Sequence, residues 1–333
     1  MEQDLIQRLC LAGLTVLPIP DVENITDIYK DAKELLDGGS TQETLIYRNA
    51  TTAHLDALTA HIDAVGSKAL ADYLDAVESL GDGDTTASLR ATSNYKDALN
   101  RVDASYPGLV TFFGSEIGLL FFKMSSIACR SAESFLQGAI LNWIGQMGLG
   151  MDIHGPYLIA YKPREHFRQK HACSFIQPTP PRWTEDHFPT VLIEAGVNKL
   201  LLRTEKDWWF TNSQPDQPQG DVKIVLLVNV DRPAKSISIE VWDRDHPQSP
   251  SQTVTISPHP EEPLSSMEVK PPRTQQSFED SRWVVKGAAI EIPFERVFLR
   301  PKKDGETDLV IAEPVLVMIA RKCWQTELMS AAA

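Results

Sequence analysis

Hydrophobic positions follow a helical spacing in the first third of the chain. Between residues 53 and 71 apolar side chains recur every three or four positions, as on one face of an amphipathic helix. A second stretch of this kind begins near Tyr95. The pattern therefore predicts that residues 1–105 are mostly helical, within an N-terminal helical region that extends to residue 114.

The pattern becomes more apolar from Ser115 onward. The segment that follows contains SEIGLLFFKMSSIACRSAESFLQGAILNWIGQMGLG and closes on Gly148 and Gly150, which is a helix-stop signal. We expect one or two buried helices here, ending near Met147. We assign residues 115–330 to the main core of the protein.

Short apolar or alternating runs follow this helical segment, and each has the length of a β-strand. The sequence NKLLLRTEKDWWFTNS predicts an amphipathic helix among them, and DRPAK predicts a hairpin loop. This order is typical of an α/β (α+β) fold in which helices flank a mixed central sheet. The predicted strands are residues 157–161, 172–176, 190–195, 223–230 and 236–242.

Residues 246–281 interrupt this order. They are dense in Pro, Ser, Gln and Glu and lack any periodicity, so we expect a flexible, exposed insertion. After it, AAIEIPFERVFLRP predicts one strand and a short helix. The last such segment, DLVIAEPVLVMIARKCW, predicts a closing strand and helix.

Charge divides the chain unevenly. The formal net charge is -13, with 32 Lys and Arg against 45 Asp and Glu. Residues 1–129 hold 9 of these basic and 19 of these acidic residues. Strong negative charge repels a phosphate backbone, so the acidic N-terminal region is a poor candidate for nucleic-acid binding. The remainder is close to neutral, which leaves room for a local basic patch.

The four cysteines, at positions 10, 129, 173 and 323, form no CxxC pair. Scattered thiols in a chain of this size fit a reducing compartment. The N-terminus has no basic segment followed by an apolar run, and no stretch has the apolar length of a membrane span. We therefore expect an intracellular protein, cytoplasmic or nuclear, with no membrane partner.

One predicted strand carries an unusual charge. In PTVLIEAG, strand alternation places Glu194 and Gly196 on the same face. A nuclease can use a Glu and a Lys at this spacing. The carboxylate then holds a divalent metal, the lysine helps to activate water, and an Asp on the preceding strand is the second ligand.

The series KHACSFIQP, FPTVLIEAGV, LLLRTEKDWWF, VKIVLLVNV and SISIEVW resembles the fungal PD-(D/E)XK nuclease-like proteins. The tail segments IEIPFERVFLRP and DLVI also resemble the C-terminal end of that family. The resemblance spans roughly residues 130–325. It implies a restriction-endonuclease-like core and metal-dependent phosphodiester hydrolysis as the ancestral activity.

The sequence departs from the family at the site that carries this chemistry. His171 stands where the family has its strand aspartate, Glu194 is retained, and Gly196 occupies the lysine position. The resemblance offers Lys206 on the following helix and Glu133 on the preceding helix as further catalytic residues. Imidazole suits Zn, Mn or Fe better than Mg²⁺. A divalent metal such as Mg²⁺ or Mn²⁺ on Glu194 and His171 is one outcome, and loss of metal binding is the outcome that we favour.

Three functions follow from this set of residues. The first is a binding protein with weakened or lost hydrolysis. Nucleic acid is a partner that the net charge disfavours, and a small-molecule ligand is the other class. The second is a lyase, isomerase or cyclase that uses His171 and Glu194 as an acid–base pair on a small organic substrate. The third is a scaffold or interaction protein.

The same residues also have structural interpretations. His171 could be hydrogen-bonded to Glu194 or to backbone without any chemistry. Lys206 would lie on a solvated helix face, and Trp208 and Trp209 would anchor the helix in the core.

Overall fold

The protein is described by a computed structural model. The chain divides into two compact units, Met1–Met124 with Arg164–Lys170, and Ser125–Pro163 with His171–Ala333. Each unit is described by itself. The residues that the structure describes are 16–24, 27–28, 31, 44–51, 53–54, 57–58, 108–114, 119–124, 126–154, 159–161, 170–172, 174–179, 182, 187–213, 220–259 and 283–331.

The described part of the first unit contains a sheet with strand order β1-β2-β4-β3. β1 pairs with β2 in parallel, and the other pairs are antiparallel. The prediction of a mostly helical N-terminal region is therefore wrong for these residues. The same holds for the helix predicted directly after Ser115, because this stretch contains β4. The strands are β1 (Val16–Pro18), β2 (Thr44–Arg48), β3 (Gly108–Gly114) and β4 (Leu119–Met124).

Long-range pairing explains why the sequence pattern failed here. β2 pairs with β4, which lies more than 70 positions further along the chain, and residues such as Phe121 and Ile46 face each other across this pair. The spacing of apolar residues within a short window carries no information on such a partner. The predicted boundary after residue 114 also falls between β3 and β4, which pair with each other.

The second unit contains a sheet with strand order β13-β12-β11-β10-β9-β8-β5. β9 and β10 are parallel and the other neighbours are antiparallel, so the predicted mixed central sheet is confirmed. The strands are β5 (Ile153–His154), β8 (Ser174–Pro178), β9 (Val191–Gly196), β10 (Ile224–Asp231), β11 (Ser236–Asp243), β12 (Gln252–Pro258) and β13 (Trp283–Lys286).

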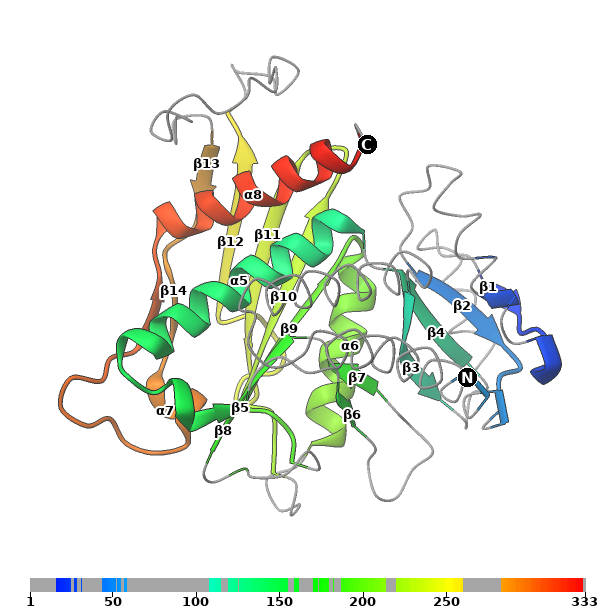
Figure 1. Ribbon diagram of the computed structural model, residues 1–333, viewed down its shortest axis with the longest axis horizontal. Coiled ribbons are helices and arrows are strands. Elements are labelled where there is room, and N and C mark those ends of the chain that lie inside the picture. The colour runs from blue at the N-terminus through cyan, green and yellow to red at the C-terminus, as the bar shows by residue number, and fades with distance from the viewer. Residues whose placement is uncertain are drawn as a thin grey trace, which may run out of the picture. The chain divides into compact units, whose positions relative to one another are not determined.

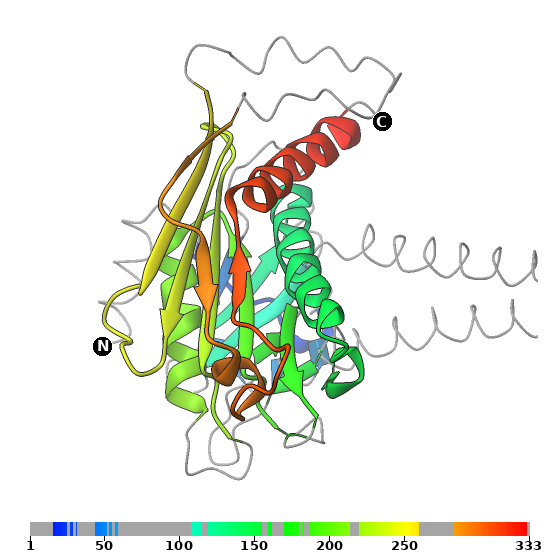
Figure 2. The same cartoon turned by 90° about the vertical axis from the view of Figure 1, so that its left-hand side faces the viewer.

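Helices cover both faces of this sheet (Figures 1 and 2). α5 (Ile127–Gln146) and α8 (Glu313–Ala331) pack together on one face, and α6 (Lys199–Asn212) lies on the other. The remaining elements of this part of the chain are η2 (Gly150–Asp152), β6 (Ile159–Tyr161), β7 (Lys170–Ala172), β14 (Ile290–Ile292), α7 (Phe294–Phe298) and β15 (Leu309–Ile311). η1 (Val22–Asn24) belongs to the first unit.

Strand alternation decides which side chains meet which helix. Val191 and Ile193 of β9 belong to the buried cluster that also contains the inner side chains of α5 and α8. Leu192 and Glu194 therefore face α6. The same cluster takes in alternate residues of β10 and β11, namely Ile224, Leu226, Val228, Val230, Ile237, Ile239 and Val241.

Most elements of the second unit agree with the sequence pattern. The structure confirms the predicted strands at β9, β10 and β11, the helix at α6, and the closing order β14, α7, β15 and α8. The predicted insertion is wrong in its first part, because β12 pairs with β11 and buries Val254 and Ile256. The sequence TVTIS within β12 alternates polar and apolar residues, but the surrounding Pro and Ser residues made the segment resemble a disordered one. The rest of the predicted insertion, 260–281, lies outside the described residues.

No helix in the described ranges has both the length and the apolar character that a membrane span requires.

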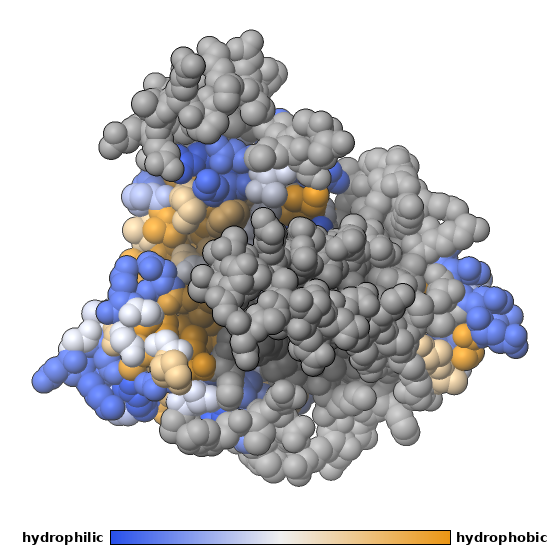
Figure 3. Space-filling model, viewed as in Figure 1, coloured by the Kyte–Doolittle hydropathy of each residue, from blue (hydrophilic) through white to orange (hydrophobic). Residues whose placement is uncertain are grey.

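The surface in Figure 3 shows a hydrophilic protrusion at the lower left. It is formed by the loop between α7 and β15, which Figure 1 shows at the same place. This loop carries the sequence RPKKDGETD.

Candidate functional site: the polar layer beneath α6

Glu194 lies near the carboxyl end of β9, in a strand whose residues are all buried. Its side chain is on the α6 face and is 7% exposed. The indole Nε1 of Trp209 donates a hydrogen bond of 2.6 Å to Glu194 Oε1. This hydrogen bond therefore connects Glu194 to α6, the helix that follows β9 in the chain.

The position of Trp209 follows from how α6 begins and packs. Asn198 caps the helix, because its Oδ1 accepts hydrogen bonds from the backbone N–H groups of Leu200 and Leu201 at 2.9 and 3.2 Å. Trp209 is fully buried, and its ring meets that of Trp208 edge to face at 4.9 Å. The prediction that the two tryptophans anchor the helix in the core is confirmed.

Lys206 has partners other than Glu194. Its Nζ donates to the Pro247 carbonyl at 3.1 Å, lies 2.5 Å from Asp207 Oδ1, and sits 4.1 Å from the centre of the Trp242 ring. The side chain is only 4% exposed, so the interpretation of a solvated helix face is wrong. The physical reason is a cation–π contact that brings the lysine stem and ammonium onto a tryptophan of β11.

Glu133 lies on α5, which covers the face of the sheet opposite to that of Glu194. Its side chain is buried, at 9% exposure. α5 packs directly on β9, the strand that carries Glu194, and the Glu194 side chain is on the opposite face, toward α6. A catalytic role of Glu133 together with Glu194 stays a prediction.

His171 belongs to β7, which pairs with β6 in a separate two-stranded sheet. The register between β8 and β9 runs from Ile176↔Val191 to Ser174↔Ile193 and stops there. The His171 side chain lies outside the described part of the structure. Its roles as a metal ligand and as an acid–base partner of Glu194 stay predictions.

A second buried carboxylate lies on the same face, and the sequence analysis missed it. Glu240 of β11 is 6% exposed; its Oε1 accepts from Arg203 Nη2 at 2.9 Å and its Oε2 from Trp242 Nε1 at 3.0 Å. Leu227 is the register partner of both Glu194 and Glu240. The two carboxylates thus lie two strand spacings apart, about 10 Å. The alternation in SISIEVW was the available signal, because it places Glu240 on one face with Trp242.

Among the residues that the structure describes, no group of three or more His, Cys, Asp and Glu side chains is arranged as metal ligands. Glu194 is the predicted ligand whose side chain is described. A carboxylate oxygen is a suitable ligand for Mg²⁺ or Mn²⁺. The structure therefore supplies one carboxylate of the predicted metal site.

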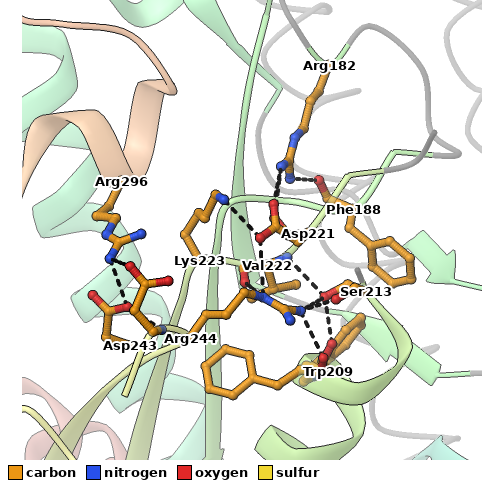
Figure 4. A network of polar contacts seen from close by, with 12 residues as sticks. Arg182, Phe188, Trp209, Ser213, Asp221, Val222, Lys223, Asp243, Arg244 and Arg296 are labelled. Atoms are coloured by element: carbon orange, nitrogen blue, oxygen red, sulfur yellow. Dashed lines mark hydrogen bonds and ion pairs between the residues drawn. The ribbon is translucent and has the colours of Figure 1, made fainter. Parts of the chain in front are cut away.

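The opposite end of the sheet carries a cluster of charges centred on Asp221 (Figure 4). Three cations surround its carboxylate: Arg182 at 3.4 Å, Lys223 at 2.8 Å and Arg244 at 3.3 Å. Asp221 is 3% exposed, so this charge lies inside the protein. Sequence analysis did not find the cluster, because its members come from separate segments of the chain.

Backbone carbonyls complete the coordination of the two arginines. Arg244 Nε donates to the Val222 carbonyl at 2.7 Å, and its Nη2 donates to the Phe210 carbonyl at 2.9 Å. Arg182 donates to the carbonyl oxygens of Phe188 and Asp221. Burial lowers the pKa of Arg244, while the charge of Asp221 opposes this shift. The cluster thus ties the end of α6 to the starts of β9 and β10, which is a structural role.

No family model and no curated protein matches this chain.

Proposed function

We propose that the second unit is a divergent PD-(D/E)XK-type domain that acts by binding a partner and has weakened or lost phosphodiester hydrolysis. The order of its elements supports this assignment. A long helix, α5, precedes the strands; β8 and β9 are antiparallel; and α6 connects β9 to its parallel neighbour β10. This is the element order that the resemblance implies for a restriction-endonuclease-like core.

The hydrogen bond between Trp209 and Glu194 carries the proposal about activity. A catalytic carboxylate that holds Mg²⁺ must direct its oxygens toward an octahedral ion that retains several waters. One oxygen of Glu194, Oε1, accepts a short hydrogen bond from a fully buried indole, and the residue is 7% exposed. These contacts favour a role in which the retained carboxylate fixes α6 on the sheet.

The surroundings of Glu194 support the same conclusion. Lys206, the lysine that the resemblance offers as a catalytic residue, directs its ammonium to Pro247, Asp207 and the Trp242 ring. A catalytic lysine in a nuclease places its ammonium beside the reacting phosphate and water. The described contacts of Lys206 serve the attachment of α6 to β11.

The test is a cleavage assay on the full chain with Mg²⁺ or Mn²⁺ and with single- and double-stranded DNA and RNA. We expect no cleavage that depends on Glu194. The matched control is Glu291→Gln, which removes an exposed carboxylate of β14. Metal-dependent cleavage that is lost in Glu194→Gln and retained in Glu291→Gln would restore a working nuclease and overturn the proposal.

A further inference from the structure

Two polar side chains of the sheet lie next to each other beneath the N-terminal half of α6. Asn229 of β10 and Ser238 of β11 are direct partners in the strand register. Their neighbours Val228 and Ile237 belong to the core on the α5 and α8 face, so alternation turns Asn229 and Ser238 toward the α6 face. Asparagine is depleted in strands, and its presence in this central strand calls for a compensating interaction.

The described residues supply no such interaction for their oxygens. Asn229 Oδ1 and Ser238 Oγ are both buried, and neither has a hydrogen-bond partner in the part of the chain that the structure describes. Ser238 as a whole is 6% exposed. Buried polar atoms in native proteins are almost always hydrogen-bonded to protein or to ordered water, so this adjacent pair requires an explanation.

The position of the pair agrees with a ligand site. Asn229 is also the register partner of Gly196, the last residue of β9. β9 and β10 are parallel, and both residues lie toward their carboxyl ends, where open α/β sheets bind their ligands. Glu194 is a diagonal neighbour of Asn229 on the same face, at a spacing of about 7–8 Å between such positions.

The chemistry of the pair defines what it would accept. An amide oxygen only accepts hydrogen bonds, and a serine hydroxyl both accepts and donates, so a ligand group with several N–H donors satisfies both. Two carboxylates lie on the same face, two residues along the strands from this pair: Glu194, which accepts from Trp209, and Glu240, which is paired with Arg203. Carboxylates at this range favour a positively charged donor over a neutral one.

We propose that Asn229 and Ser238 form a subsite for the primary ammonium group of a small organic ligand. The ammonium donates to Asn229 Oδ1 and Ser238 Oγ, and Glu194 contributes a favourable charge from the same face. This subsite goes beyond the proposed loss of hydrolysis, and it stands or falls independently of whether the protein cleaves nucleic acid.

The test measures binding to the full chain with three probes at equal ionic strength, by calorimetry and by the midpoint of thermal unfolding. Ethylammonium and putrescine carry the N–H donors, and tetramethylammonium carries a positive charge without them. We expect the first two to bind and to raise the unfolding midpoint, and tetramethylammonium to do neither. Equal effects of all three probes, or no binding at all, would overturn the subsite.

Variants locate the binding. Asn229→Leu and Ser238→Ala should each weaken putrescine binding by at least about tenfold, the ratio expected when a charged group loses one hydrogen bond. Thr326→Ala, on the exposed side of α8, is the control and should bind like the wild type. Asn229→Asp places a second charge in the subsite and should tighten binding, which keeps the test informative if Asn229→Leu does not fold. If putrescine binds the variants as it binds the wild type and still raises their unfolding midpoint, the subsite is overturned. The pair then only holds water.

Discussion

At the scale of single residues, the bond between Glu194 and Trp209 makes a measurable prediction. Glu194→Ala should destabilise the protein because it leaves a buried indole N–H without its acceptor. Glu194→Gln keeps an acceptor oxygen and should cost less. A double-mutant cycle with Trp209→Phe, measured by urea unfolding, should give a coupling energy of about 1–3 kcal/mol. Additive effects of the two single changes would remove the main support for a structural role of Glu194.

Gly287 gives a second prediction at this scale. It lies between β13 and β14 with φ at +117°, and a Cβ there would be 2.5 Å from the Thr253 carbonyl oxygen, which belongs to backbone. Gly287→Ala should therefore destabilise the protein by about 1–3 kcal/mol. The measurement is the midpoint of urea unfolding.

Gly138 is the matched control for Gly287. It lies within α5, and a Cβ built there would meet nothing within 4 Å. Gly138→Ala should stabilise the protein by about 0.5–1 kcal/mol, because alanine favours the helix. Equal effects of the two substitutions would contradict the argument from backbone geometry.

At the scale of elements, the loop between α7 and β15 depends on one carboxylate. Arg300 binds both oxygens of Glu306 at 2.6 and 2.7 Å, and the backbone N–H of Lys303 donates to the same side chain. The hydrogen bonds with Arg300 lower the pKa of Glu306 from 4.5 to about 2. Deprotonated Glu306 therefore fixes the conformation of this loop through its hydrogen bonds with Arg300 and Lys303.

The sign of the pH effect follows from this lowered pKa. The stabilising contribution of Glu306 is fully present above about pH 4.5, the ordinary value, and is lost as the pH falls toward about 2. The difference in unfolding free energy between wild type and Glu306→Gln should therefore shrink over this range. A difference that stays constant from about pH 7 to about pH 2 would contradict the assignment.

At the scale of the second unit as a whole, the Asp221 cluster joins segments that are distant in the sequence. Removing its carboxylate leaves Arg182, Lys223 and Arg244 close together without the anion that compensates them. Breaking a buried ion pair by removing one partner costs about 3–5 kcal/mol, so Asp221→Asn should destabilise the protein by this amount.

An exposed ion pair provides the comparison for this prediction. Lys302 pairs with Asp308, and their side chains are 40% and 43% exposed, so Lys302→Gln should change the unfolding free energy by less than about 1 kcal/mol. Both variants are measured by chemical unfolding at equal ionic strength. A small effect of Asp221→Asn would mean that the backbone carbonyls alone stabilise the two arginines.

The sequence by itself determined the elements whose signal is local. The apolar run of β9, the helical spacing of α6 and the closing strands and helices were readable because burial on one face repeats along a short window. Strand alternation also placed Glu194 on the same face as Gly196, within a run of apolar residues. Burial of this carboxylate was therefore a fair expectation.

Only the tertiary structure decided which partners these residues meet. The pairing of β2 with β4, the joining of β12 to the sheet, the bond from Trp209 to Glu194 and the burial of Lys206 against Trp242 all connect positions far apart in the chain or on different elements. Local periodicity indicates which side chains of an element face the core. The identity of the neighbours that they meet there depends on strand order and on which helix covers which face of the sheet. For this reason the sequence predicted that Glu194 matters, and the fold showed what holds it.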